Sequence, residues 1–279
     1  MLDIPTLPNE LEQEILQLAA RISPETALRL LAVSKKVKIW IQPIVYEVVV
    51  IQDHDLKPSY YPECVGPHSN LNQIFKENGG HIRSLLLHHP SESSLLAYCP
   101  TITSLSMDQP LTLELLAAIQ KIPLHHLRCN LTGCKSAVDP DSLAFSNITH
   151  LDLLNPPRWR HCQFLAQMPK LTHLALDDPE GSSRLEETVK SALEHCRYLE
   201  ALLLVLDLVT GQIQDDIEVR EDYLPVQDNR IVAISVHPLV GWLNGELGKG
   251  DMWKVAEGVI ANRIKEHSTA HSENSNSSS

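Results

Sequence analysis

The sequence lacks the segments by which membrane and secreted proteins are recognised. None of its stretches approaches the ~20 consecutive apolar residues that a helix needs to span a bilayer. Residues 1–5 are acidic and contain no basic segment followed by an apolar run, so we expect no signal peptide. The six cysteines are scattered, which favours reduced thiols. Together these absences predict a cytoplasmic or nuclear protein that does not contact membranes.

The motifs of common catalytic and metal sites are also missing. The chain contains no GxGxxG segment, no P-loop and no GxSxG nucleophile turn. Its 14 histidines and six cysteines form no CxxC or HExxH pair. Cys129 and Cys134 lie five positions apart but have no second pair. We therefore predict no enzymatic activity, no cofactor and no metal site.

Positive charge is scarce in this sequence. Lys and Arg total 23 against 35 Asp and Glu, which gives a formal net charge of −12. Phosphate backbones and anionic lipid surfaces repel such a chain, so nucleic acid is not an expected partner. The apolar fraction of 43% is sufficient for a core, and 279 residues suffice for one large or two modest domains.

The first fifty residues have the pattern of three short helices. Leu11, Ile15 and Leu18 recur at helical spacing and form one apolar stripe. Ser23 and Ser34 are placed to cap the second and third helices. About 45 residues bury too little surface to be stable alone, so this segment requires a partner.

Three motifs in this segment resemble the F-box, a three-helix module. They are Leu7-Pro8-x-Glu10-Leu11-x3-Ile15, Leu31-Ala32-Val33-Ser34-Lys35 and Trp40-Ile41-x-Pro43-Ile44-x-Tyr46. The resemblance covers residues 4–47, although Val37 stands where the family usually has a tryptophan. It implies docking on the adaptor Skp1, and through Skp1 on a cullin ubiquitin ligase. The residues implied in Skp1 binding are Leu7, Pro8, Glu10, Leu11, Ile15, Leu31, Val33 and Trp40. The alternative for Val33 and Trp40 is that they belong to the core of the helices.

From residue 82 onwards a pattern of apolar-x-x-apolar-x-apolar returns seven times. Its copies begin at Ile82, Ile102, Leu124, Ile148, Leu171, Leu199 and Ile231. The alternation in each copy predicts a strand with two inward apolar residues. Segments 111–122, 158–168 and 184–196 have helical periodicity. A strand followed by a helix every 20 to 32 residues is typical of leucine-rich repeats, and it predicts an α/β fold with a parallel sheet.

These repeats are similar to the irregular leucine-rich repeats of F-box proteins, especially those of fungal type. We therefore expect an F-box at 1–47, a repeat domain at 48–266 and a disordered tail at 267–279. Residues 48–51 would supply an opening strand, and a last helix at 252–264 would cap the stack. The acidic segment 207–230 exceeds a normal connection and is predicted to be an exposed loop.

The outward positions of the repeats carry several polar side chains. In a solenoid these positions line the concave face, which usually binds a partner. We predict that the face binds a substrate protein through His126, Arg128, His150, Asp152, His173 and Asp177. The three histidines share one position on three consecutive copies, so their rings would stand in a row. The alternative is a solvated face without a partner.

Both resemblances lead to one functional hypothesis. The chain would be a substrate adaptor of a Skp1-cullin-F-box ubiquitin ligase, with the F-box docked on Skp1 and the repeats presenting a target. Such an adaptor performs no chemistry and supplies proximity and orientation. The alternative is a non-catalytic leucine-rich-repeat scaffold or inhibitor, in which the first helices only cap the repeats.

Overall fold

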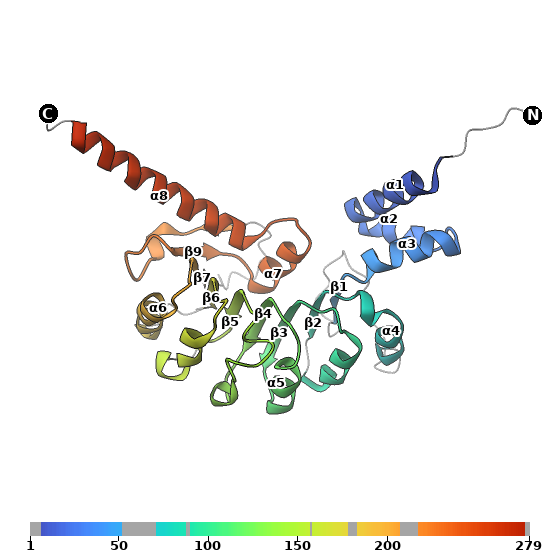
Figure 1. Ribbon diagram of the computed structural model, residues 1–279, viewed down its shortest axis with the longest axis horizontal. Coiled ribbons are helices and arrows are strands. Elements are labelled where there is room, and N and C mark those ends of the chain that lie inside the picture. Colours follow the sequence, from blue (N-terminus) through green and yellow to red (C-terminus); the bar gives the residue numbers. More distant parts are fainter. Residues whose placement is uncertain are drawn as a thin grey trace, which may run out of the picture. The chain divides into compact units, whose positions relative to one another are not determined.

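The computed structural model describes residues 7–51, 71–87, 90–156, 158–177, 183–206 and 217–276. In these residues the chain is an α/β protein with a nine-stranded, mostly parallel sheet in the order β1-β2-β3-β4-β5-β6-β7-β9-β8 (Figure 1). The strands are β1 (Val48–Val50), β2 (Ser84–Leu87), β3 (Ser104–Pro110), β4 (His126–Asn130), β5 (His150–Leu153), β6 (His173–Asp177), β7 (Ala201–Leu206), β8 (Glu218–Val219) and β9 (Ile231–Ser235). The chain divides into two compact units, Met1–Leu105 and Ser106–Ser279, and the division falls within β3.

The connecting elements are α-helices and short 3-10 helices. The α-helices are α1 (Asn9–Ile22), α2 (Pro24–Leu30), α3 (Lys35–Val45), α4 (Leu71–Asn78), α5 (Leu113–Ile119), α6 (Ser183–His195), α7 (Pro238–Glu246) and α8 (Met252–Asn276). The 3-10 helices are η1 (Gly79–His81), η2 (Pro90–Tyr98), η3 (Lys135–Ala137), η4 (Trp159–His161), η5 (Gln163–Gln167) and η6 (Glu221–Tyr223).

The first unit begins with the three expected helices. The Ser23 hydroxyl accepts a hydrogen bond from the Thr26 N–H at 3.3 Å, and the Ser34 hydroxyl accepts one from the Val37 N–H at 3.1 Å. These caps satisfy donors that the helix itself leaves unpaired. A small apolar cluster of Ala20, Ala27, Val37, Ile41 and Val45 joins the helices. The opening strand is also confirmed, because β1 pairs in parallel with β2.

In the second unit the repeat register is confirmed from β4 to β7. Leu151, Leu174 and Leu202 are partners on adjacent parallel strands, and all three are fully buried. His126, His150 and His173 are likewise partners, one position earlier. Successive side chains of a strand point to opposite faces, so this register places the histidine row and the leucine row on opposite sides of the sheet.

The last repeat departs from the predicted register. The pattern aligns Ile234 with Leu202, but β7 and β9 instead pair Leu202 with Ile231 and Val205 with Ile234. A shift of three residues is odd, and an odd shift moves every side chain to the opposite face. Ile234 and Val236 therefore pack in one cluster with Leu203 and Val205. The pattern predicts Leu203 and Val205 on the outward face, and Ile234 and Val236 on the inward face.

One predicted helix and one predicted loop also differ. Segment 158–168 forms η4 and η5 instead of one α-helix, because Cys162 between them adopts a non-helical conformation with φ −119° and ψ 13°. Segment 207–230 is not only loop, since β8 pairs antiparallel with β9 and η6 follows it. Residues 207–216 of that segment lie outside the described part of the chain.

The last helix covers one face of the second unit's strands, opposite α5 and α6 (Figure 1). Met252, Trp253 and Ala256 of α8 are buried against Ala175, Leu203, Val205 and neighbouring apolar residues. The helix continues to Asn276, past Ile264 and into the segment expected to be disordered. Neither proline nor glycine interrupts it there, and the Ser268 hydroxyl bonds the Ile264 carbonyl at 2.9 Å. Of the helices in the described ranges, α8 included, none combines the length and apolarity that a bilayer crossing requires.

Candidate functional site

The α1–α3 helices expose a set of large apolar side chains. The exposed members are Leu7, Leu11, Ile15, Leu18, Ile22, Leu28, Val33 and Ile39. Four of them are residues that the sequence implies in Skp1 binding, and their exposed fractions lie between 47% for Leu11 and 64% for Val33. Pro8 and Glu10 are exposed as well. Apolar surface of this extent on a small helical module is typical of a docking surface.

The remaining two residues of that set are placed differently. Leu31 and Trp40 are partly buried and pack against the apolar cluster of the three helices. Gln17 donates a hydrogen bond to the Trp40 carbonyl at 3.3 Å, and the Lys36 ammonium lies 4.6 Å from the centre of the Trp40 ring. Trp40 therefore packs within the helical module and is also partly exposed, so both its predicted contact with Skp1 and the core alternative stay predictions.

The histidine row of the second unit is covered, which contradicts the expectation of an open concave face. The Trp253 ring of α8 meets all three imidazoles edge to face, with ring centres 6.4 Å from His126, 5.1 Å from His150 and 5.3 Å from His173. His173 is 5% exposed and Asp152 is also 5% exposed. The pattern of one repeat cannot reveal this cover, because α8 lies far along the chain.

Carboxylates from three elements surround the row. His126 Nδ1 lies 3.2 Å from Glu246 of α7, and His126 Nε2 lies 3.4 Å from Asp152 of β5. His173 Nε2 lies 3.1 Å from Glu257 of α8. Glu246, Trp253 and Glu257 were not predicted as site residues, since no motif marks them. The row is therefore a covered polar cluster that ties α7 and α8 to the strands.

The cluster holds its histidines in different charge states. Burial lowers the pKa of His126, but the charge and hydrogen bond of Asp152, followed by those of Glu246, outweigh it and raise the pKa to about 9. Burial, followed by the charges of the neighbouring His173 and His126, lowers the pKa of His150 to about 3, and the opposing charge of Glu246 does not offset this. At neutral pH His126 is therefore an imidazolium between two carboxylates, and His150 is neutral.

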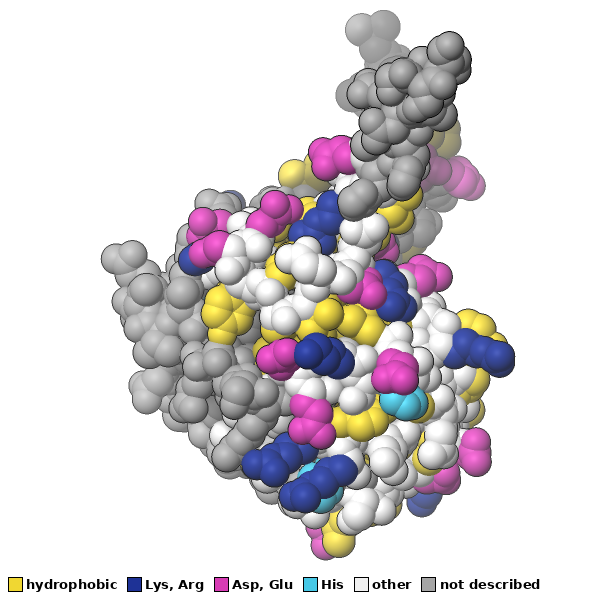
Figure 2. Space-filling model, turned by 90° about the vertical axis from the view of Figure 1, so that its left-hand side faces the viewer, with side chains coloured by type: hydrophobic (Ala, Val, Ile, Leu, Met, Phe, Trp, Pro, Cys, Tyr) yellow, Lys and Arg dark blue, Asp and Glu magenta, His cyan; other side chains and the backbone are white. Residues whose placement is uncertain are grey.

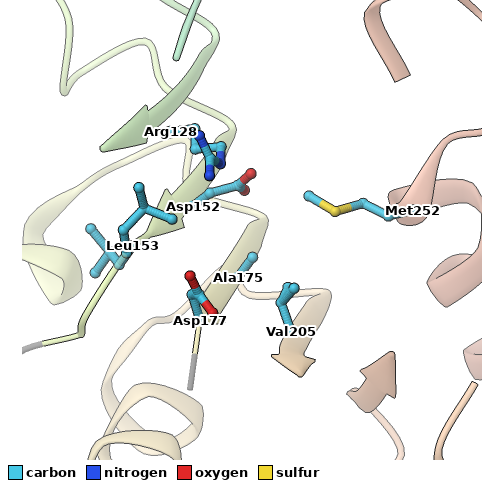
Figure 3. Close-up of a pocket in the computed structure, with 8 residues that line it drawn as sticks. Arg128, Asp152, Leu153, Ala175, Asp177, Val205 and Met252 are labelled. Carbon is cyan, nitrogen blue, oxygen red and sulfur yellow. The ribbon is translucent and has the colours of Figure 1, made fainter. Parts of the chain in front are cut away.

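Arg128, Asp152 and Asp177 all line one small cavity beneath α8, together with Leu153, Leu154, Ala175, Val205 and Met252 (Figure 3). Arg128 donates to the Ser106 hydroxyl at 3.0 Å and to Asp108 at 2.5 Å. The structure thus brings together all six predicted substrate-binding residues, on β4, β5 and β6. It places them under a helix instead of on an open surface.

The described ranges contain no candidate metal site. No group of three or more His, Cys, Asp or Glu there has the geometry of a metal site. Burial raises the pKa of the Cys99 thiol to about 12 and that of Cys196 to about 11. Thiols of this kind remain protonated near neutral pH.

On the face shown in Figure 2, acidic and basic side chains are interspersed around small apolar areas. Such a surface produces no extended field of one sign. A scan against models of protein families finds no match to the chain, and a comparison with curated proteins finds none either.

Proposed function

We propose that this protein is a substrate adaptor of a Skp1-cullin-F-box ubiquitin ligase. The observation that carries the proposal is the exposed apolar surface of α1–α3, which is formed by Leu7, Leu11, Ile15 and Val33 at the positions of the F-box resemblance. A module that leaves these side chains in water gains stability when a partner covers them.

The second unit supports the other half of the proposal. Parallel strands that repeat in register from β4 to β7 fit the stacked units of a leucine-rich-repeat solenoid. In this proposal the target protein binds the strand face that carries the histidine row, and α8 moves away from that face to admit it. The chain contributes proximity and orientation, and the ubiquitin transfer is carried out by its partners.

Co-purification with Skp1 tests the proposal. The full chain and a Leu7→Ala/Leu11→Ala variant are each expressed with an affinity tag in the native organism. We expect Skp1 and a cullin to be retained with the full chain and to be reduced with the variant. If the full chain retains neither protein, the adaptor function is wrong. A target bound without Skp1 would instead favour a repeat scaffold or inhibitor.

A further inference from the structure

Arg128 and Asp152 are neighbours on the face of the strands that α8 covers. They are register partners on β4 and β5, and their exposed fractions are only 4% and 5%. Each side chain is engaged along one edge. Arg128 Nη1 donates hydrogen bonds to Ser106 and Asp108, and Asp152 Oδ2 is hydrogen-bonded to His126.

The other edge of each side chain has no hydrogen-bond partner in the described part of the chain. Arg128 Nε and Asp152 Oδ1 are both buried and unpaired. Both residues line the cavity beneath α8, and Figure 3 shows the Met252 side chain directed toward them from the opposite side. Met252 forms part of the wall of this cavity, and the space left in it is about that of one water molecule.

An apolar thioether is a poor complement to this pair. A buried donor and a buried acceptor without partners both destabilise the closed arrangement. α8 therefore covers the site without satisfying its polar atoms. A better occupant would accept a hydrogen bond from Arg128 Nε and donate one to Asp152 Oδ1.

A carboxamide meets both requirements, because its oxygen accepts and its adjacent nitrogen donates. A carboxylate cannot donate to Asp152 Oδ1, and an ammonium group cannot accept from Arg128 Nε. A hole of the size of the Met252 side chain admits another side chain of similar length. The glutamine side chain has about that length.

We propose that Arg128 and Asp152 form a recognition site for an asparagine or glutamine side chain of a target protein, and that Met252 of α8 occupies this site in the absence of the target. The inference rests on the proposed function only in taking the strand face as the target-binding face. It adds the chemistry of the recognised group and requires that a target displace the start of α8.

The chemistry of the site is tested first within the chain. Met252→Gln places a carboxamide opposite Arg128 and Asp152, and Met252→Leu is the apolar control of similar size. We expect the thermal midpoint of Met252→Gln to lie above that of Met252→Leu by ~2–4 °C, the shift that one satisfied polar pair produces in a domain of this size. A midpoint of the glutamine variant at or below that of the leucine variant overturns the proposal.

The second test uses a small probe. Met252→Ala enlarges the cavity, and acetamide, acetate and methylammonium are added at equal concentration and ionic strength. We expect acetamide alone to raise the midpoint of this variant and to shift the Nε–H NMR signal of Arg128, since binding to the folded state stabilises it. The wild-type chain, with Met252 in place, should show neither effect.

An acetamide effect no larger than that of acetate overturns the proposal. Should Met252→Ala fail to fold, the comparison of Met252→Gln with Met252→Leu still decides it. Neither test involves Skp1 or a target. Failure of the carboxamide site is therefore distinguishable from failure of the adaptor function, which the co-purification reports.

Discussion

The imidazole rings of His150 and His173 are stacked, with centres 4.2 Å apart and planes inclined by 12°. Two imidazolium ions at this distance would repel each other. Glu246 and Glu257 face the row from α7 and α8, Asp152 faces it from β5, and Trp253 closes it off. These carboxylates contact His126 and His173. The protonated form of His150, the middle ring, is therefore the one that they stabilise least.

Acid should therefore destabilise the chain through His150. The His150 pKa is about 3 in the folded chain because of burial and then the charges of His173 and His126, and the unfolded value is about 6.5. The unfolded state binds more protons between these values, so this contribution is complete above about pH 6.5 and is lost as the pH falls toward 3. His150→Phe keeps a ring that cannot be protonated. Urea unfolding at pH 7 and pH 4.5 should show a smaller loss of stability in this variant than in wild type; equal losses would contradict the prediction.

His126 should act in the opposite direction. Burial opposes its protonation, but Asp152 and Glu246 raise its folded pKa to about 9, above the unfolded value of about 6.5. Its contribution is present below about pH 6.5 and is lost as the pH rises toward 9. We expect His126→Gln to be less stable than wild type at pH 6 by on the order of 2 kcal/mol and to lose that difference near pH 9. Urea unfolding at both pH values measures this, and a difference that does not change with pH would show that His126 is uncharged.

The register of the central strands could be predicted because it depends on local rules. Each repeat has one apolar face that only stacking can bury, and the period of two assigns Leu151 and Leu174 to that face without knowledge of the rest of the chain. The same rule places His150 and His173 on the other side. It fails at Ile234, because several neighbouring apolar residues of β9 allow more than one register.

The cover over the histidine row could not be predicted. It depends on contacts between residues far apart in sequence, since Glu257 follows His173 by 84 positions and Glu246 follows His126 by 120. The apolar residues of the last helix indicate that it packs somewhere, but they do not specify the face. A polar row that appears solvent-exposed from its own repeat is therefore buried by a distant helix.

Burial also changes what mutations on the two faces should do. Leu174→Ala should cost about 2–5 kcal/mol of unfolding free energy, the usual range for a core leucine. Asp152→Ala, which an open face would tolerate, should cost about 1–3 kcal/mol, because it leaves the buried ring of His126 with one acceptor fewer. Ile264→Ala, at a residue that is 52% exposed, is the control and should stay within about 0.5 kcal/mol of wild type. Denaturant unfolding compares the three, and a silent Asp152→Ala would show that α8 leaves the face open in solution.

Binding to Skp1 should depend on the exposed end of the helical module. Leu7 and Pro8 are exposed and project no side chain into the apolar cluster of α1–α3, so their replacement should leave the fold intact. We expect Leu7→Ala/Pro8→Ala to weaken Skp1 binding by about 1–3 kcal/mol, the loss typical of contacts at the centre of an interface. Leu113→Ala is a matched control, because Leu113 is an apolar residue of the second unit with a 60% exposed fraction. Isothermal titration calorimetry with purified Skp1 measures both variants, alongside thermal midpoints that should equal that of wild type. If the double variant binds Skp1 as tightly as wild type and as tightly as the Leu113→Ala control, Skp1 does not dock on this surface.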